Sequence, residues 1–273
     1  MRPDKRLGQH FLRDADVLED IAAVADVAHS AGALEIGPGE GALTAYLVDA
    51  GRPVVAVDRD PRAVRELARR FGDRVRAVEG DALAVDLEAL LPAPGEDGRL
   101  PVVVGNLPYN AASAIFRRLL GLERPVARMV LMFQREVALR IVAGPGSRAY
   151  GVPSVLRSLV ADAWIVREVP PHAFYPRPKV DSAVVLVEPR ATPAFPDAPE
   201  ATRRQDAFGS FLAGVFQSRR KVLANAVKPT DAVAAAGLDP RARAEGLTPE
   251  ELWRLFQAAE RAGEAGTGAP GAP

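Results

Sequence analysis

The sequence predicts an α/β protein, with a doubly wound, Rossmann-like parallel sheet followed by a smaller all-helical domain. Up to about residue 190, short Val-rich apolar runs alternate with segments whose apolar residues recur at helical spacing. This alternation is typical of parallel strands joined by helical crossovers. A Pro-rich stretch then ends it, and a chain of 273 residues, 48% of them apolar, can form two domains that each bury a core.

Seven apolar runs are predicted strands, and four of the segments between them are predicted helices. The predicted strands are 32–37, 53–59, 74–80, 101–106, 128–133, 164–169 and 182–188. The predicted helices are 42–50, 61–71, 113–121 and 135–144. This order along the chain favours a doubly wound sheet.

The predicted domain boundaries follow changes in composition. Residues 1–190 are predicted to form the sheet domain, and the Pro-rich stretch at 191–201 is predicted to be a linker. Residues 202–262 contain only helical patterns and are predicted to form the smaller domain. Residues 263–273 contain too few large apolar side chains to fold and are predicted to be a disordered tail.

Charge and residue usage exclude several classes of protein. The 35 basic and 35 acidic residues give no net charge, and the basic cluster at 217–228 is, on charge alone, best explained as a solvated helix face. Without cysteine, and with three histidines at no ligand spacing, the sequence predicts no disulfide and no metal site. It contains no apolar run of roughly 20 residues and no secretory signal pattern at its start, which predicts a cytoplasmic protein without membrane segments.

Glycines follow the first predicted strand. Ligands of open parallel sheets bind beyond the carboxyl ends of the strands, and Gly37, Gly39 and Gly41 stand there, before a predicted helix. Glycines allow a tight turn and a close approach of the backbone to a ligand. Gly37, Gly39 and Ala42 also satisfy the loose dinucleotide pattern G-x-G-x-x-G/A, so a nicotinamide-dependent oxidoreductase remains an alternative, as does a tight turn without a ligand.

Carboxylates follow the next two predicted strands. Asp58 lies 21 residues after Gly37, a spacing at which a carboxylate accepts the hydroxyl protons of a ribose, and it therefore predicts a nucleoside ligand. Asp60 is better explained as the N-cap of a helix that begins at Pro61. Asp81 can accept a hydrogen bond from an adenine amino group, but an ordinary turn aspartate explains it equally well.

The segment VVVGNLPYNAAS, residues 102–113, separates the alternatives. An enzyme that methylates an aromatic amino group can use two acceptors, the Asn106 side-chain oxygen and the Leu107 carbonyl, to hold both N–H groups and favour a more tetrahedral nitrogen. Pro108 stiffens the turn, and Tyr109 can stack on the base. A hydride-transfer enzyme has no obvious use for these residues. The structural alternative is a helix cap at Asn106 with Tyr109 in the core.

Seven motifs stand in one order along the chain. They are GQHFL (8–12), EIGPGEGALT (35–44), GNLPY (105–109), MFQREVALRI (132–141), PGSRAYG (145–151), FYPRPKVDSAVV (174–185) and FQSRRKVLANAV (216–227). Together they resemble, across about residues 5–255, the ribosomal RNA adenine N6,N6-dimethyltransferase family, the small-subunit dimethyladenosine transferases. The last of the seven resembles the signature of the family's helical domain.

The resemblance implies which residues bind S-adenosylmethionine. They are His10 and Leu12, Gly37 and Gly39 at the methionine part, Asp58 at the ribose, Asp81 and Ala82 at the adenine, and Asn106 beside the methyl donor. Many members have Asn where this chain has His10, and Glu where it has Asp58. Both positions keep a polar or acidic group, so cofactor binding is expected with altered contacts.

The resemblance also implies where RNA binds. The target adenine is expected between Tyr109 and Phe174, with Pro176 and Pro178 behind Phe174, an arrangement that suits a base taken out of its stack. The expected phosphate contacts are Arg219, Arg220 and Lys221.

The implied activity is dimethylation of adenine N6, expected at two adjacent adenines near the 3′ end of small-subunit ribosomal RNA, during ribosome biogenesis. The expected partner is that RNA or the assembling small subunit, and nothing in the sequence requires more than a monomer. Two alternatives stay open: a large-subunit adenine N6-methyltransferase that confers antibiotic resistance, and a ribosome-assembly factor with secondary catalysis. PGSRAYG and FYPRPKVDS favour the small-subunit branch, and the intact GNLPY favours catalysis.

Overall fold

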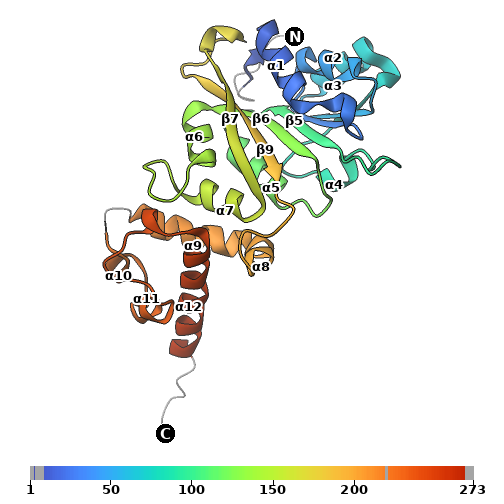
Figure 1. Ribbon diagram of the computed structural model, residues 1–273. Helices are drawn as coiled ribbons and strands as arrows, with labels where there is room; N and C mark the ends of the chain where they lie inside the picture. Colours follow the sequence, from blue (N-terminus) through green and yellow to red (C-terminus); the bar gives the residue numbers. More distant parts are fainter. Residues whose placement is uncertain (1–2, 4–8, 219–220, 268–273) are drawn as a thin grey trace. The chain divides into compact units, whose positions relative to one another are not determined.

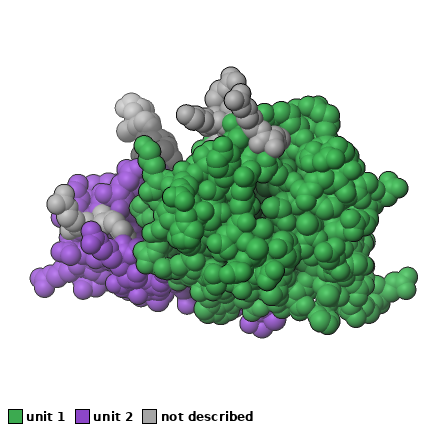
Figure 2. All heavy atoms as spheres, turned by 90° about the horizontal axis from the view of Figure 1, so that it is seen from above, with its two compact units in different colours: residues 1–142, 161–189 green, residues 143–160, 190–273 purple. Residues whose placement is uncertain are grey.

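A computed structural model describes the chain except residues 1–2, 4–8, 219–220 and 268–273 (Figure 1). The chain divides into two compact units, coloured separately in Figure 2. Unit 1 comprises residues 1–142 and 161–189, and unit 2 comprises residues 143–160 and 190–273.

Unit 1 is built on a seven-stranded sheet in the order β4-β3-β2-β5-β6-β9-β7. The strands are β2 (Ala33–Ile36), β3 (Val54–Asp58), β4 (Val75–Glu79), β5 (Val102–Asn106), β6 (Arg128–Gln134), β7 (Ala161–Val169) and β9 (Ser182–Pro189). All seven predicted strands are therefore confirmed. β9 runs antiparallel between β6 and β7, because the connection from β7 contains no helix long enough for a crossover.

Helices cover both faces of this sheet (Figure 1). On one face, α1 (Ala15–Ala25), α2 (Ala42–Asp49) and α3 (Pro61–Phe71) share an apolar core with alternate strand residues such as Val104 and Met132. On the other face, α5 (Ala112–Leu120) places Phe116 edge-on to Phe133 of β6, with 5.5 Å between ring centroids. Successive residues of a strand point to opposite faces, so Met132 and Phe133 show the sheet to be doubly wound, as predicted.

Two short strands lie outside the main sheet. β1 (Phe11–Leu12) and β8 (Phe174–Tyr175) pair antiparallel, with Phe11 opposite Tyr175 and Leu12 opposite Phe174. Neither strand was predicted, because two residues are too few to show an alternating pattern. The pair joins the start of the sheet domain to its end and so brings two distant motifs together.

The elements of unit 2 in the described part of the chain are all helical. They are α7 (Val152–Val160), α8 (Ala198–Arg203), α9 (Gln205–Gln217), α10 (Leu223–Ala226), α11 (Asp231–Ala235), the 3₁₀ turn Ala244–Gly246 and α12 (Pro249–Thr267). The aromatic core joins α9 to α12: Phe208 and Trp253 meet edge-on with centroids 5.2 Å apart, and Phe256 packs beside both.

The two units differ from the predicted domains in three places. α7 belongs to unit 2, because it buries Val155, Leu156 and Leu159 and packs on α8, α9 and α12. The predicted linker at 191–201 is part of the same unit, with Phe195 buried and α8 beginning within it. The predicted tail at 263–273 begins inside α12, which continues to Thr267, and its remainder lies outside the described residues.

Candidate active site

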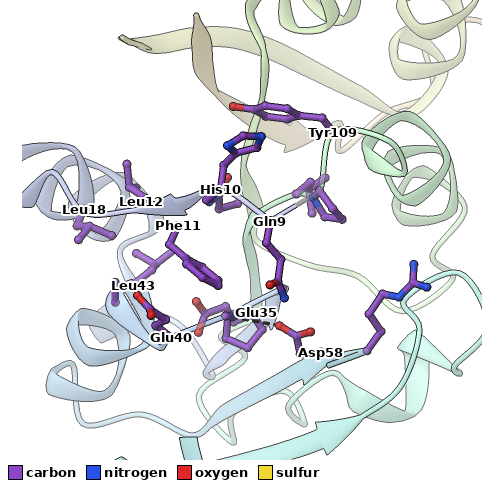
Figure 3. A pocket seen from close by; sticks show the side chains of 18 residues that line it. Gln9, His10, Phe11, Leu12, Leu18, Glu35, Glu40, Leu43, Asp58 and Tyr109 are labelled. Carbon is purple, nitrogen blue, oxygen red and sulfur yellow. Dashed lines mark hydrogen bonds between the residues drawn. The ribbon is translucent and has the colours of Figure 1, made fainter. Parts of the chain in front are cut away.

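A pocket opens at the carboxyl ends of β2, β3 and β5 in unit 1 (Figure 3). Its volume is about 790 Å³ with its open mouth included. The predicted site residues that line it are His10, Leu12, Gly37, Gly39, Asp58, Asn106, Leu107, Pro108 and Tyr109. We refer to Glu35, Gly37, Gly39 and Asp58 as the cofactor side of this pocket, and to His10, Asn106, Leu107 and Tyr109 as its target side.

The glycine loop after β2 requires glycine for two separate reasons. Gly37, Gly39 and Gly41 all have positive φ, at 70°, 56° and 77°. A residue with a side chain would be strained in this backbone conformation. In addition, a Cβ on Gly39 would lie 2.9 Å from Cε1 of Phe11. Phe11 thus packs directly on the loop, and no residue with a side chain fits between them.

Asp58 fixes this loop from the end of β3. Its two carboxylate oxygens accept hydrogen bonds from the backbone N–H groups of Gly39 (3.1 Å) and Asp60 (2.8 Å). The residue is 8% exposed, and burial raises the pKa of the carboxyl, although both backbone bonds act against this shift. Each oxygen keeps acceptor capacity for a ligand hydroxyl, so Asp58 can bind a ribose while it supports the loop.

Asp60 is the N-cap of α3, as predicted. Its side chain accepts a hydrogen bond from the backbone N–H of Arg62, and the Arg62 guanidinium, followed by Gln9, holds the pKa of the Asp60 carboxyl at about 2. Gln9 donates to the same carboxylate over 3.0 Å and also lines the pocket. The segment before β1 is therefore tied to the carboxyl end of β3.

Glu35 is a site residue that the sequence analysis missed. It sits in the middle of β2 with 2% of its surface exposed, and it faces the pocket (Figure 3). Thr44 of α2 donates to Glu35 Oε2 over 2.6 Å, yet burial dominates and raises the pKa of the Glu35 carboxyl to about 7. A carboxylate inside an otherwise apolar strand is the signal that marks such a residue in a sequence.

On the target side, hydrogen bonds from side chain to backbone join three chain segments. Asn106 Nδ2 donates to the His10 carbonyl over 3.1 Å, which leaves Oδ1 as the acceptor of that amide. His10 Nδ1 lies 2.7 Å from the Pro176 carbonyl. Since a carbonyl only accepts, Nδ1 carries the proton and Nε2 is the acceptor of a neutral His10 ring.

Tyr109 stands at the mouth of the target side. Its ring stacks on His10, with centroids 5.4 Å apart and an interplanar angle of 25° (Figure 3). Its hydroxyl shares a 2.7 Å hydrogen bond with Ser182 Oγ at the start of β9, and burial raises the pKa of the phenol. Tyr109 is thus a fixed ring at the pocket edge and not a residue of the apolar core, the alternative raised by its sequence context.

Three of the predicted catalytic and cofactor-binding residues do not line the pocket. Phe174 is 3% exposed and packs in the main apolar core, so the structure does not place its ring opposite Tyr109. Asp81 Oδ1 caps its own turn by accepting from the Leu83 N–H over 2.9 Å. Ala82 is buried beside it, and its carbonyl accepts from Arg118 over 2.7 Å.

The predicted RNA contacts are only partly described. Arg219 and Arg220 lie outside the described residues, whereas Lys221 is exposed in the connection between α9 and α10. In the described ranges no group of three or more His, Asp or Glu side chains is arranged to hold a metal ion. No helix in the same ranges is long and apolar enough to cross a membrane.

Together these features define a class of protein: a doubly wound α/β enzyme whose strand-end pocket is built for a nucleoside cofactor. Comparison with known proteins narrows the class. Residues 2–261 match the family model for ribosomal RNA adenine dimethylase. The chain therefore belongs to the ribosomal RNA adenine dimethylase family, and it is an S-adenosylmethionine-dependent enzyme that dimethylates adenines of ribosomal RNA.

Individual relatives agree with this assignment. The chain is 43% identical over 265 residues to ribosomal RNA small subunit methyltransferase A of Mesorhizobium japonicum. This alignment covers 93% of this chain and 92% of the relative. The chain is 42% identical to the protein of that name from Rubrobacter xylanophilus, over 94% of this chain and 95% of the relative.

Solved structures show a similar fold. A dimethyladenosine transferase from Plasmodium falciparum superposes with a TM-score of 0.72 at 23% identity, covering 93% of this chain and 98% of that one. The 23S rRNA methyltransferase ErmE superposes with a TM-score of 0.63 at 28% identity, over 92% of this chain and 99% of that one. At 23% identity, the first of these shows the fold alone.

Proposed function

We propose that this enzyme dimethylates N6 of adenines in small-subunit ribosomal RNA, and that the target side of the pocket orients the adenine. The observation that carries the second part is the Asn106 amide, which the His10 carbonyl holds with Oδ1 left as its acceptor. Relatives above 40% identity named for the small subunit support the choice of RNA over the large-subunit alternative.

The cofactor side suits S-adenosylmethionine. Two buried carboxyl groups, Glu35 and Asp58, face a pocket whose glycine loop allows the ligand a close approach to the backbone. When bound, this cofactor supplies an electrophilic methyl group on a positively charged sulfur. Asp58 is proposed to accept hydrogen bonds from the ribose hydroxyls, and Gly37 and Gly39 to border the methionine part.

The target side is proposed to orient the N6 amino group of the adenine. Asn106 Oδ1 and the Leu107 carbonyl accept the two N6 hydrogens and favour the geometry in which the nitrogen lone pair can attack. Pro108 restricts the backbone that presents this carbonyl, and Tyr109 stacks on the base. Most of the rate acceleration then comes from positioning, since a bound amine beside its methyl donor needs no further encounter.

The remaining assignments rest on the family resemblance. His10, Leu12 and Asn106 are proposed to border the cofactor as well. Asp81 and Ala82 are proposed at the adenine of the cofactor, Phe174 as the second ring at the target base, and Lys221 with Arg219 and Arg220 as phosphate contacts. Phe174 and Asp81 would have to move or change partners to act in this way. The substrate is proposed to be small-subunit ribosomal RNA or the assembling small subunit, with the protein acting as a monomer in the cytoplasm.

One labelling experiment tests the reaction and its substrate. Small and large ribosomal subunits lacking dimethyladenosine are incubated separately with the protein and S-adenosylmethionine carrying a radioactive methyl group, and the labelled nucleoside is identified after digestion. We expect N6,N6-dimethyladenosine from the small subunit, lost with Asn106→Ala. Label confined to the large subunit would refute the choice of RNA, and binding to small subunits without label on either would favour an assembly factor.

A further inference from the structure

We propose that Tyr175 and Arg13 form a second base-binding subsite, a stacking platform for an unpaired nucleotide next to the target adenine. The inference extends the proposed function, because it assumes that the adenine enters at Tyr109. It assigns a role to two residues that the proposed mechanism does not use.

The first observation is a large ring left in solvent on a rigid element. Tyr175 is 53% exposed, whereas its neighbour Phe174 is 3% exposed and packs in the core. Both belong to β8, which is paired with β1, so the exposed ring stands on a hydrogen-bonded backbone. Exposed aromatic rings on rigid elements are typical of binding surfaces.

The second observation is a cation already stacked on this ring. The guanidinium carbon of Arg13 lies 4.6 Å from the Tyr175 ring centroid. Arg13 is held there by Glu40, which accepts a hydrogen bond from its Nη2 over 3.2 Å. Arg13 therefore covers one face of the ring, and no other ring or cation in the described part of the chain stacks on the opposite face.

The third observation places the platform beside the pocket. Tyr175 is directly opposite Phe11 in the antiparallel pair, and Phe11 lines the pocket. Cross-strand partners point to the same side of a sheet, with Cβ atoms about 5 Å apart. The next residue, Pro176, accepts the hydrogen bond of His10, whose ring stacks on Tyr109. The contact between His10 and Pro176 thus connects Tyr109 to the residue that follows Tyr175.

The charge around the platform identifies the partner as nucleic acid. Arg177 and Lys179 follow on the same segment, both exposed, and neither forms an ion pair with a described residue. Stacked rings with cations beside them bind single-stranded nucleotides, because the base stacks on the ring and the cations donate hydrogen bonds to the phosphates. A nucleotide that flanks an extruded adenine is itself freed from stacking on one side, so it is available to this platform.

The test compares three variants at saturating S-adenosylmethionine over a range of unmethylated small subunits. We expect Tyr175→Ala to raise KM for the subunit between about 5-fold and 150-fold, the range of one lost base–aromatic stack, with kcat and cofactor affinity unchanged. Tyr175→Trp should restore the wild-type KM. The matched control is Trp164→Ala, which removes another ring of unit 1 that is 49% exposed, on the edge strand β7.

Equilibrium binding of subunits, measured by filter binding without cofactor, separates the two proposals. Weaker binding by Tyr175→Ala alone supports the platform, even if the wild-type protein transfers no methyl group and the proposed function fails. If Tyr175→Ala and Trp164→Ala both bind and react like the wild type, the platform is refuted while the proposed function stands. Equal losses in both variants would also refute it, because they would indicate a general effect of removing surface rings.

Discussion

The two sides of the pocket are built in different ways. The cofactor side uses neighbouring strands and the loops that follow them, and backbone groups fix it: the N–H groups of Gly39 and Asp60 both bond to Asp58. On the target side, three separate chain segments meet, because Asn106 and Tyr109 both contact His10, and His10 contacts the Pro176 carbonyl. A substitution in the glycine loop of the first side should strain the backbone, whereas one on the second side should release a side chain from its orientation.

The largest effect is expected where the target side loses its acceptor. Asn106→Ala removes Oδ1 and should lower kcat by about 10²- to 10³-fold, the usual result of deleting one preorganised polar contact to a transition state. Because the glycine loop and Asp58 remain, cofactor affinity should change much less. Single-turnover methyl transfer and calorimetric titration with S-adenosylmethionine measure the two quantities.

Asn110, which follows Tyr109 in the chain, provides the control for this prediction. It is exposed and does not line the pocket, so Asn110→Ala should retain wild-type turnover. A loss of cofactor affinity in Asn106→Ala as large as its loss of kcat would mean that the two sides are not separate, and the comparison between them would fail.

The buried Glu35 on the cofactor side predicts a change of folding stability with pH. Burial raises the pKa of its carboxyl from 4.5 to about 7. Between these two values the folded protein keeps a proton that the unfolded chain releases, so stability falls as the pH rises through this window. The loss reaches at most about 3 kcal/mol, and Glu35→Gln should abolish it.

Urea denaturation without cofactor at pH 5 and pH 8 measures this effect. The wild type should lose more stability than Glu35→Gln between the two pH values, and Glu19→Gln, which alters an exposed carboxyl of α1, should behave like the wild type. Equal pH dependence in all three proteins would show that Glu35 is charged in the folded state.

A substitution in the glycine loop tests whether backbone geometry governs cofactor binding. Gly39→Ala places a Cβ at positive φ and 2.9 Å from Phe11, and should weaken S-adenosylmethionine binding about 10-fold. Gly51→Ala is the matched control, because Gly51 has a similar φ of 68° but open space around it. It should lose stability and keep cofactor affinity, and equal affinity losses would contradict the local explanation.

Pocket residues on both sides were predictable from the sequence, apart from Glu35, for a physical reason. Gly37, Gly39 and Asp58 follow predicted strands directly, and parallel strands bring their carboxyl ends to one edge. Glu35 was missed because it lies within a strand, whereas the predicted site residues were sought at the ends of strands. The seven strands were predicted because each apolar run shows its own local pattern.

The target side depends on contacts that no local pattern contains. The contact of His10 with Pro176 and the stack of His10 on Tyr109 follow from β1 pairing with β8, two strands of two residues each. The same limit applies to α7. It lies between predicted strands of the sheet domain, and only its packing on α8 and α9 assigns it to unit 2.

The smallest predicted effect concerns the Tyr109 hydroxyl. Its burial raises the pKa of the phenol, so the group stays neutral at physiological pH and acts through its hydrogen bond with Ser182. Tyr109→Phe keeps the stacking ring and should lower kcat/KM by about 3- to 10-fold, as expected for one net hydrogen bond. If the hydroxyl acts only through this bond, the double variant with Ser182→Ala should lose no more than Tyr109→Phe does. Additive losses in that cycle would instead show that the hydroxyl contacts the substrate, and the target side would then contain a polar group beyond Asn106 and Leu107.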